Sequence, residues 1–232
     1  MTCRETALHP LGILMSDELV QNLEIGWNIR LHFPNLTIQN KRHDFIGYVE
    51  PPMRPKEINN ELLRSNAKRI YSCIMAFGRF SEVGRAFLNG ENNLFHQPVQ
   101  DICESIGKAK PVLTDYMEYF GGGAGLTPAW DDFCAGLLFA DRFLNIGKIS
   151  PGDDFFRRIR GKTTEPSFWQ LKFTEAGKLS LAFENLLADI SIDKISSLKI
   201  ATCIGSGYSS GTDILCGILA LLSSINGAFF RV

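Results

Sequence analysis

The sequence is poor in histidine and lacks the common nucleotide-binding motifs. Its four histidines, His9, His32, His43 and His96, lie outside the glycine-rich segments described below, so a His-based catalytic relay is not expected. No G-x-x-x-x-G-K-[ST] string occurs, nor a strand–G-x-G-x-x-G–helix unit with an acid about 20 residues further on. A G-x-S-x-G elbow followed by Asp and His is missing as well. These absences argue against P-loop NTPases, Rossmann-type dehydrogenases and α/β-hydrolases.

Three further absences concern charge, apolar runs and cysteine pairs. The 24 basic and 25 acidic residues are well mixed and give a net charge of -1, so no nucleic-acid partner is expected. The longest apolar stretch, Ile214–Phe230, is interrupted by Ser and Asn and predicts a buried helix, not a membrane span. No signal peptide is expected. The six cysteines form no CxxC pair, which favours buried free thiols and a cytoplasmic location.

The composition is that of a globular protein, with 45% hydrophobic and 21% charged residues. We predict an α+β fold in a single domain over residues 1–232, with a β-rich N-terminal part at 1–50 and a helical part at 56–232. Short apolar segments at Ile25–Phe33, Leu36–Ile38 and Phe45–Val49 predict strands. Three prolines between Pro51 and Pro55 then mark the change to the helical part.

Hydrophobic periodicity predicts most of the chain after this point to be helical. A break near Gly177 is expected inside the longest segment. The expected helices lie at residues 57–79, 99–106, 112–119, 129–146, 168–190, 192–204 and 213–225.

Two similar loop-to-helix units stand out in this helical part. Asp132-Phe-Cys-Ala-Gly136-Leu-Leu and Asp213-Ile-Leu-Cys-Gly217-Ile-Leu share the pattern D-x-x-x-G-[LI]-L. Each follows a glycine-rich loop with hydroxyl side chains, at 121–128 and 205–211. The glycine lies one turn beyond the aspartate on the same helix face and permits close approach of another helix. We therefore expect the two helices to cross near Gly136 and Gly217 and to bring the loops together.

A glycine-rich loop that leads into a helix is suited to binding an anion, because the first N–H groups of the helix are unpaired and carry partial positive charge. The candidate substrate-binding residues are Gly123, Gly125 and Thr127 in the first loop and Gly207, Ser209, Ser210 and Gly211 in the second.

The acids Asp131, Asp132 and Asp213 fall in the first turns of the two helices and are the candidate catalytic residues. They would orient a substrate or loop donors, or bind a divalent metal through water. The alternative is that they only complement the helix dipoles. Carboxylates beside phosphate favour Mg²⁺, although no full ligand set is visible and no other cofactor is indicated.

A basic segment, Arg157 to Lys162, lies between the two units. It is either a solvated helix end or an anion clamp in which Arg160 or Lys162 meets a phosphate or carboxylate.

Two motifs resemble those of the AllH-like proteins. Gly123–Gly136 is similar to that family's G-x-G-L-T-P-S-x-D-D-x-x-x-G signature, and Gly205–Gly217 to its G-H-[ST]-S-G-x-D-x-L-x-G signature. Thr163 and Thr164 occupy the place of a Thr pair that the family has between them. The resemblance covers residues 99–225. Within it, Ala129 replaces the usual Ser and Tyr208 the usual His, and the bulky Trp130 is expected to narrow the pocket or to stack on a planar ligand.

The resemblance implies a subunit of an oxamate carbamoyltransferase, with AllF-like (FdrA-like) and AllG-like subunits as partners. Such an enzyme interconverts oxalurate and phosphate with oxamate and carbamoyl phosphate in anaerobic allantoin degradation, so the ligands are small anionic metabolites. Thr163 and Thr164 join the candidate substrate-binding residues on the same ground. A non-catalytic binding or scaffold subunit is the main alternative, and a free-standing hydrolase with a two-Asp metal site ranks third.

Overall fold

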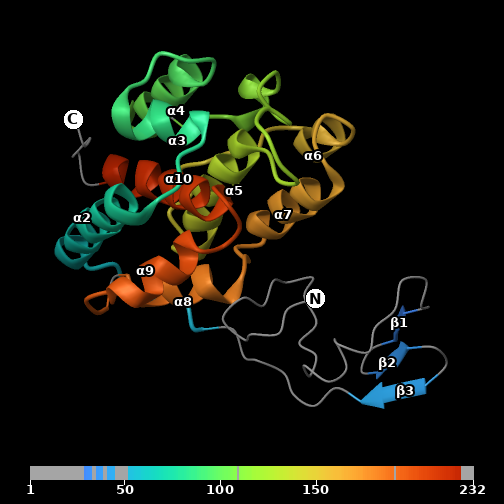
Figure 1. Cartoon of the computed structure of the whole chain (residues 1–232). Helices are drawn as coiled ribbons and strands as arrows, with labels where there is room; N and C mark the ends of the chain where they lie inside the picture. The colour runs from blue at the N-terminus through green and yellow to red at the C-terminus, as the bar shows by residue number, and fades with distance from the viewer. Residues whose placement is uncertain are drawn as a thin grey trace.

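The structure, a computed structural model, describes residues 52–108, 110–190 and 192–225 and the backbone of three strands before them. Helices make up most of the body and surround a central pair (Figure 1). The helices are α2 (Asn60–Phe77), α3 (Glu82–Asn89), α4 (His96–Lys108), the short 3-10 helix η2 (Leu113–Tyr116), α5 (Ala129–Phe143), α6 (Phe155–Ile159), α7 (Glu165–Glu175), α8 (Leu181–Asp189), α9 (Ser197–Ile204) and α10 (Ser210–Ile225).

The fold is mostly α, and the predicted α+β class with a β-rich N-terminal part is wrong. Helix accounts for 62% and strand for 2% of the interpretable structure. The strands β1 (Ile29–His32), β2 (Asn35–Ile38) and β3 (Lys41–Asp44) pair antiparallel in the order β1-β2-β3. Four-residue strands in so small a sheet supply no layer on which helices could build a core. The expected strand at Phe45–Val49 lies outside the described residues.

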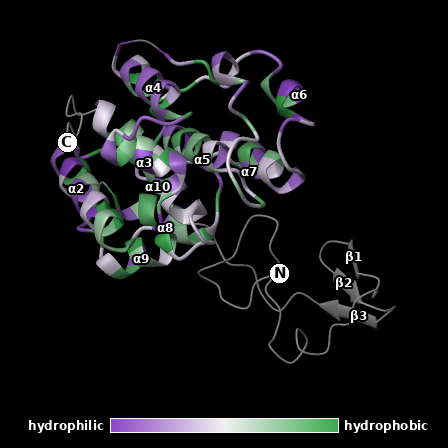
Figure 2. Ribbon diagram, turned by 45° about the horizontal axis from the view of Figure 1, so that its top comes forward, coloured by the Kyte–Doolittle hydropathy of each residue, from purple (hydrophilic) through white to green (hydrophobic). Residues whose placement is uncertain are grey.

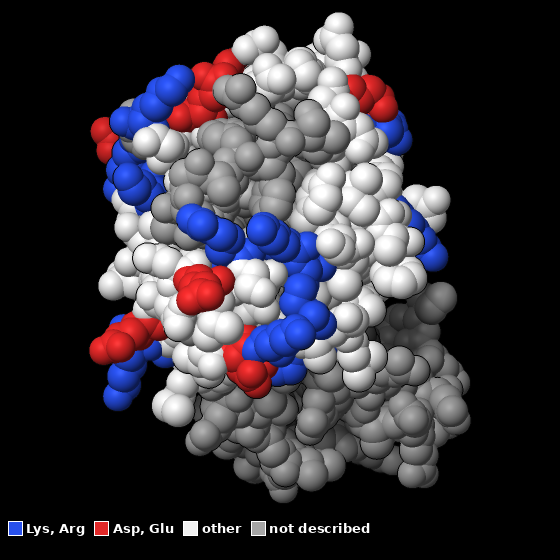
Figure 3. All heavy atoms as spheres, turned by 90° about the vertical axis from the view of Figure 1, so that its left-hand side faces the viewer, with Lys and Arg blue, Asp and Glu red and all other residues white. Residues whose placement is uncertain are grey.

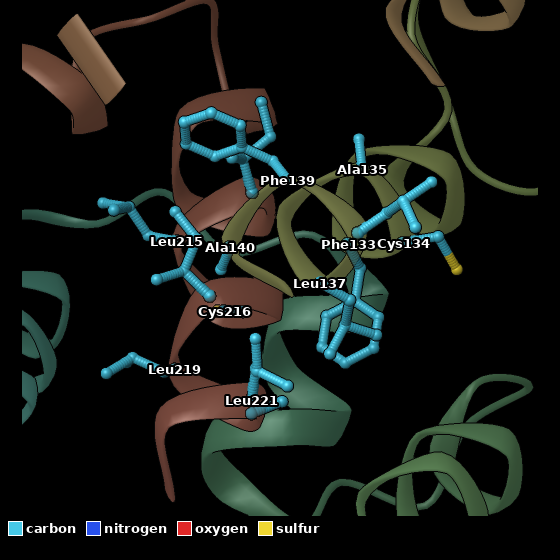
Figure 4. Packing of buried hydrophobic residues seen from close by; sticks show 14 of the residues in the cluster. Phe133, Cys134, Ala135, Leu137, Phe139, Ala140, Leu215, Cys216, Leu219 and Leu221 are labelled. Carbon is cyan, nitrogen blue, oxygen red and sulfur yellow. The ribbon is translucent and has the colours of Figure 1, made fainter. Parts of the chain in front are cut away.

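Helices α5 and α10 cross at the centre of the body, as predicted from the two glycines. A Cβ atom on Gly136 would lie 2.0 Å from the carbonyl oxygen of Ile214, and one on Gly217 would lie 2.0 Å from that of Phe133. The two backbones therefore touch where any larger residue would force them apart. Around the crossing, both helices carry buried apolar side chains, among them Leu215 of α10 and Phe139 of α5 (Figure 4).

The boundaries of several helices follow from local sequence. The side chains of Asn59, Ser81, Thr164 and Ser196 accept hydrogen bonds from backbone N–H groups at the starts of α2, α3, α7 and α9. The predicted break near Gly177 is confirmed, because this residue has φ +69° and separates α7 from α8. The expected helix at 112–119 is reduced to η2 and a turn, and the short helices α3 and α6 were not predicted.

The core is mostly apolar and includes Trp130, which was expected at a ligand pocket. Hydrophobic residues gather toward the middle of the body, and hydrophilic ones dominate outer turns such as those of α4 (Figure 2). The indole of Trp130 is fully buried and packs among aromatic rings, 6.1 Å from Phe95 and 5.5 Å from Tyr119 between centroids. The expectation that Trp130 narrows a pocket or stacks on a ligand is therefore wrong.

The cysteines that the structure describes carry free thiols, and all of these except Cys73 are buried. Burial raises the pKa of Cys103 to about 12, so this thiol is an inert core group. Within the described residues, no helix combines the length and the apolar character needed to span a membrane.

Candidate functional site

The two glycine-rich loops meet side by side at the starts of α5 and α10. The hydroxyl oxygens of Thr127 and Ser210 are 2.9 Å apart and share a hydrogen bond. Gly123 and Gly207 have φ values of +110° and +77°, which residues with a Cβ rarely adopt. The crossing of the two helices thus places both helix N-termini at one site, as the repeated D-x-x-x-G pattern predicted.

A cavity of about 1230 Å³ opens where the loops meet. Its walls are the two loops, the start of α3 and the start of α8, with Gln170 of α7 between them. Small-molecule sites usually occupy about 300–1,000 Å³. The cavity therefore has room for two small substrates together.

Asp131 faces away from this cavity and ties the first loop to α7. Its carboxylate accepts hydrogen bonds from the backbone N–H of Gly121 at 2.9 Å, from the hydroxyl of Ser167 at 2.7 Å and from that of Thr163. Burial raises its pKa, and these donors offset part of that effect by stabilising the charged form. Its oxygens are occupied by internal donors, so it acts on the shape of the loop.

Asp132 lies directly behind the hydroxyls that line the cavity. One carboxylate oxygen accepts from the amide of Gln170 at 2.7 Å, and the other accepts from the hydroxyl of Thr127 at 3.0 Å. Burial raises its pKa to about 7, against the effects of the Gln170, Ser210 and Thr127 hydrogen bonds. The acid is thus connected to the cavity through side chains that themselves reach it.

Asp213 holds the matching place in the second unit but contacts α3. Its Oδ1 accepts a hydrogen bond of 2.6 Å from the hydroxyl of Ser81. Its Oδ2 is buried and has no hydrogen-bond partner among the residues that the structure describes. Burial raises the pKa of this acid to about 7, and the charge of Asp132 adds to the rise. Two buried carboxyls that influence each other therefore stand behind one cavity.

The structure divides the predicted site residues into two groups. The residues that line the cavity are Gly123, Gly125, Thr127, Gly207, Ser209 and Ser210. The residues that lie behind its walls are Asp131, Asp132, Asp213, Thr163, Thr164 and Gly211.

The residues behind the walls shape the loops. Thr164 begins α7 and donates a 2.5 Å hydrogen bond to the carbonyl oxygen of Leu126, which fixes the first loop from outside. A Cβ on Gly211 would lie 2.0 Å from the carbonyl oxygen of Cys203, so this glycine lets α9 and α10 come close. The Thr pair and Gly211 thus support the loops without reaching the cavity.

The basic segment between the two units is not part of the cavity wall. Arg160 is exposed, lies 3.8 Å from the carboxylate of Glu165 and stacks over the ring of Phe168. Lys162 is exposed as well. Of the two alternatives for this segment, the structure favours the solvated helix end.

Sequence reasoning missed the cavity residues that come from α3, α7 and α8. Ser81, Arg85, Gln170 and Ser180 all lie in its wall. Arg85 brings a cation, which hydrogen-bonds Glu91 and the carbonyl oxygen of Phe80. Ser81 and Ser180 are the N-cap residues of α3 and α8. The Ser before each helical run was a visible start signal, but nothing local showed that both helices begin at the same cavity.

Tyr208, which stands where the AllH-like proteins have His, lies at the rim of the cavity. Its side chain is 76% exposed, and the guanidinium of Arg79 lies 4.8 Å from its ring centroid. Ala129, the other departure, is a buried part of the cavity wall. Both departures from the family pattern therefore fall at the cavity.

No metal-binding site can be assigned among the residues that the structure describes. Among the residues that the structure describes, no three His, Cys, Asp or Glu side chains are grouped to hold a metal ion. On the face of the molecule shown in Figure 3, Lys and Arg form a band with Asp and Glu side chains beside it. Mg²⁺ and the lack of a nucleic-acid partner stay predictions from the sequence.

Comparison with known proteins supports the resemblance. The family model AllH, described as oxamate carbamoyltransferase subunit AllH, matches residues 119–222. This span includes both glycine-rich loops, Asp131, Asp132 and Asp213. No solved structure matches the chain. Over residues 119–222, which carry most of the cavity, the chain is therefore a match to the AllH family.

Proposed function

We propose that this chain is a subunit of a carbamoyltransferase that binds small anionic substrates in the cavity between the two loops. The substrates are oxamate and carbamoyl phosphate in one direction and oxalurate and phosphate in the other. One observation carries the proposal: the two loops in the AllH-like region join through Thr127 and Ser210 on a single cavity. The AllH description supplies the reaction class.

The residues of the cavity suit the reaction that this assignment requires. In transfer to oxamate, the amide nitrogen forms a C–N bond to the carbamoyl carbon, the C–O bond to phosphate breaks, and the proton of the nitrogen passes to the departing phosphate. Negative charge on the carbonyl and phosphate oxygens then needs donors fixed in advance. The helix starts, the glycine backbone and the hydroxyls of Ser209 and Ser210 supply these donors, and Arg85 adds a positive charge.

The three aspartates take positioning roles in this proposal. Asp131 holds the first loop to α7, whereas Asp132 and Asp213 hold hydroxyls that line the cavity. Positioning and electrostatic stabilisation alone can lower the barrier of such a transfer. Thr163, Thr164 and Gly211 contribute by shaping the two loops.

Partner subunits complete the site. Large apolar or aromatic side chains beside the cavity are exposed, among them Leu126 at 72% and Tyr208 at 76%. Such groups at the rim of a pocket are suited to contact with another protein. We expect AllF-like and AllG-like partners, a role in allantoin degradation, and a cytoplasmic location in keeping with the free thiols.

The first experiment is a thermal-shift titration of the purified chain with carbamoyl phosphate, phosphate, oxamate and oxalurate, with and without Mg²⁺. A ligand at 100 times its Kd that binds only the folded state stabilises it by about 2.7 kcal/mol. We expect a selective shift that is lost in the double variant Thr127→Val, Ser210→Ala. The matched control is Ser224→Ala, because Ser224 lies near the other end of α10 and donates to the carbonyl oxygen of Ala220 within that helix.

The non-catalytic scaffold is separated from the enzyme by activity of the assembled complex. Ala129 and Tyr208, which replace the family's Ser and His at the cavity, are the observations that favour the scaffold. If the double variant assembles and supports full carbamoyl transfer, the site lies in another subunit and the catalytic proposal is wrong. If the double variant assembles and transfer is lost, the cavity of this chain takes part in the reaction.

A further inference from the structure

The hydroxyls that line the cavity are connected to buried acids behind its wall. Thr127 donates to Asp132 at 3.0 Å, and its oxygen lies 2.9 Å from that of Ser210. Ser81 donates to Asp213 at 2.6 Å. Thr127, Ser210 and Ser81 are all part of the cavity wall, so the acids decide where the protons of these hydroxyls point.

Which hydroxyl donates in the hydrogen bond between Thr127 and Ser210 depends on the protonation state of Asp132. A hydroxyl has one proton to donate. When Asp132 is ionised, Thr127 gives its proton to the carboxylate, and Ser210 gives its own proton either to Thr127 or to the carboxylate itself. Both protons then point away from the cavity, toward the buried acid, and Ser210 offers an anion in the cavity only oxygen lone pairs.

The direction reverses when the carboxyl of Asp132 holds a proton. The acid then donates to Thr127, Thr127 donates to Ser210, and the proton of Ser210 is free for a ligand. The other oxygen of Asp132 keeps its hydrogen bond from the amide of Gln170 in both states. The acid therefore stays in place while the hydrogen bonds of the two hydroxyls reverse direction.

We propose that Asp132 is a positioning residue that couples anion binding to proton uptake: an anion in the cavity favours the protonated acid, because only then does Ser210 donate to the anion. This inference rests on the proposed function, since it concerns the same cavity. It adds that binding of a fixed-charge anion takes up as much as one proton.

The surroundings of Asp132 favour this exchange near neutral pH. The elements packed against it are α3, α7, α8 and α10. The charged or titratable groups that these elements and α5 itself bring toward the site are Asp131, Asp213, Glu82, Arg85 and Glu184, while α7 supplies the neutral Gln170. Burial raises the pKa of Asp132 to about 7, so the carboxyl can gain a proton when an anion arrives.

The test is titration calorimetry of the full chain with sulfate and with oxamate, neither of which titrates near neutral pH. Heats measured in two buffers of different ionisation enthalpy give the number of protons taken up. We expect uptake approaching one proton per anion above about pH 7, with affinity falling as much as about tenfold per pH unit there. Below about pH 6 the uptake disappears, because the acid is already protonated.

Two variants separate this coupling from a merely structural role. In Asp132→Asn the amide replaces the protonated acid as donor to Thr127, so proton uptake is lost and binding above about pH 7 becomes tighter than in the wild type. Ser210→Ala removes the hydroxyl at the cavity, and binding becomes weaker and independent of pH. The control is Asp101→Asn on the exposed surface of α4, which keeps the wild-type uptake.

Each outcome decides the inference. Sulfate or oxamate binding without proton uptake in the wild type overturns it and leaves the proposed function standing. Uptake with sulfate, together with no binding of oxamate or carbamoyl phosphate, supports the coupling and contradicts the proposed substrates. If neither anion binds even at about pH 6, where Ser210 is expected to donate, the inference is wrong, and the proposed function is then judged by activity of the assembled complex.

Discussion

Replacing Gly136 with alanine tests the closest contact of the fold. The new Cβ would lie 2.0 Å from the carbonyl oxygen of Ile214 and 2.8 Å from its carbonyl carbon. These are backbone atoms of α10, which cannot move aside by turning about a side-chain bond. The methyl group therefore forces α5 and α10 apart at the crossing that brings the two loops together.

The expected change in the free energy of unfolding of Gly136→Ala is the difference between an overpacking cost and a gain in helix propensity. Overpacking in a core costs about 1–3 kcal/mol, and a contact with rigid backbone belongs at the upper end of that range. Alanine in place of glycine inside a helix stabilises the folded state by about 1 kcal/mol through its higher helix propensity. The free energy of unfolding should fall by about 2 kcal/mol, which for a chain of this size lowers Tm by roughly 4–8 °C.

The assay is thermal and urea unfolding of Gly136→Ala beside a matched control, Gly107→Ala. Gly107 lies in α4, and no atom is found within 4 Å of its added Cβ. The control should therefore gain about 0.4–1 kcal/mol. If Gly136→Ala is as stable as the control, the two backbones do not touch at the crossing and the account of the fold is refuted.

Three further changes test acids that are buried in the helical body. Thr163→Val removes one of the hydroxyl donors of the buried Asp131 and should cost about 1–3 kcal/mol in urea unfolding at neutral pH. Burial raises the pKa values of Asp132 and Asp213 from 3.8 to about 7. Each acid therefore contributes stability that is full below pH 3.8 and is lost as the pH rises to 7, at most about 4 kcal/mol per acid. The free energy of unfolding measured against pH should show this fall, and Asn variants should flatten it. Asp141 is buried in α5, pairs with Arg142, whose side chain is 24% exposed, and accepts a hydrogen bond from the backbone N–H of Lys148. Asp141→Ala removes both interactions and should cost about 1–3 kcal/mol, and an unchanged midpoint in urea would contradict this expectation.

The central crossing could be predicted because its signal is local and repeated. Asp132 with Gly136 and Asp213 with Gly217 each place a small residue one turn beyond an acid, and close helix packing needs a small residue on each partner. The α+β class was wrong for the opposite reason. Short apolar runs such as Leu36–Ile38 predict strands, and β2 lies there, but such runs do not show whether the strands form a layer on which helices can pack.

The candidate site was predicted in its loops and missed in its remaining walls. The glycine pattern identified Thr127 and Ser210, whereas Arg85 and Gln170 reach the cavity only through the packing of α3 and α7, which leaves no local trace in the sequence. The burial of an aspartate cannot be predicted from the sequence either, because a helix N-terminus favours aspartate whether the side chain faces solvent or the core. Asp132 therefore looked like a group that touches substrate, although it lies behind the Thr127 hydroxyl that lines the cavity.

The central claim is that the two glycine-rich loops form one anion-binding site. The most direct measurement is a crystal structure of the chain with bound oxamate and carbamoyl phosphate. The account predicts that the anions lie in the cavity between Gly123–Thr127 and Gly205–Ser210, within hydrogen-bond distance of the Ser210 hydroxyl. Anions bound elsewhere on the chain, with the cavity filled only by water, would contradict it.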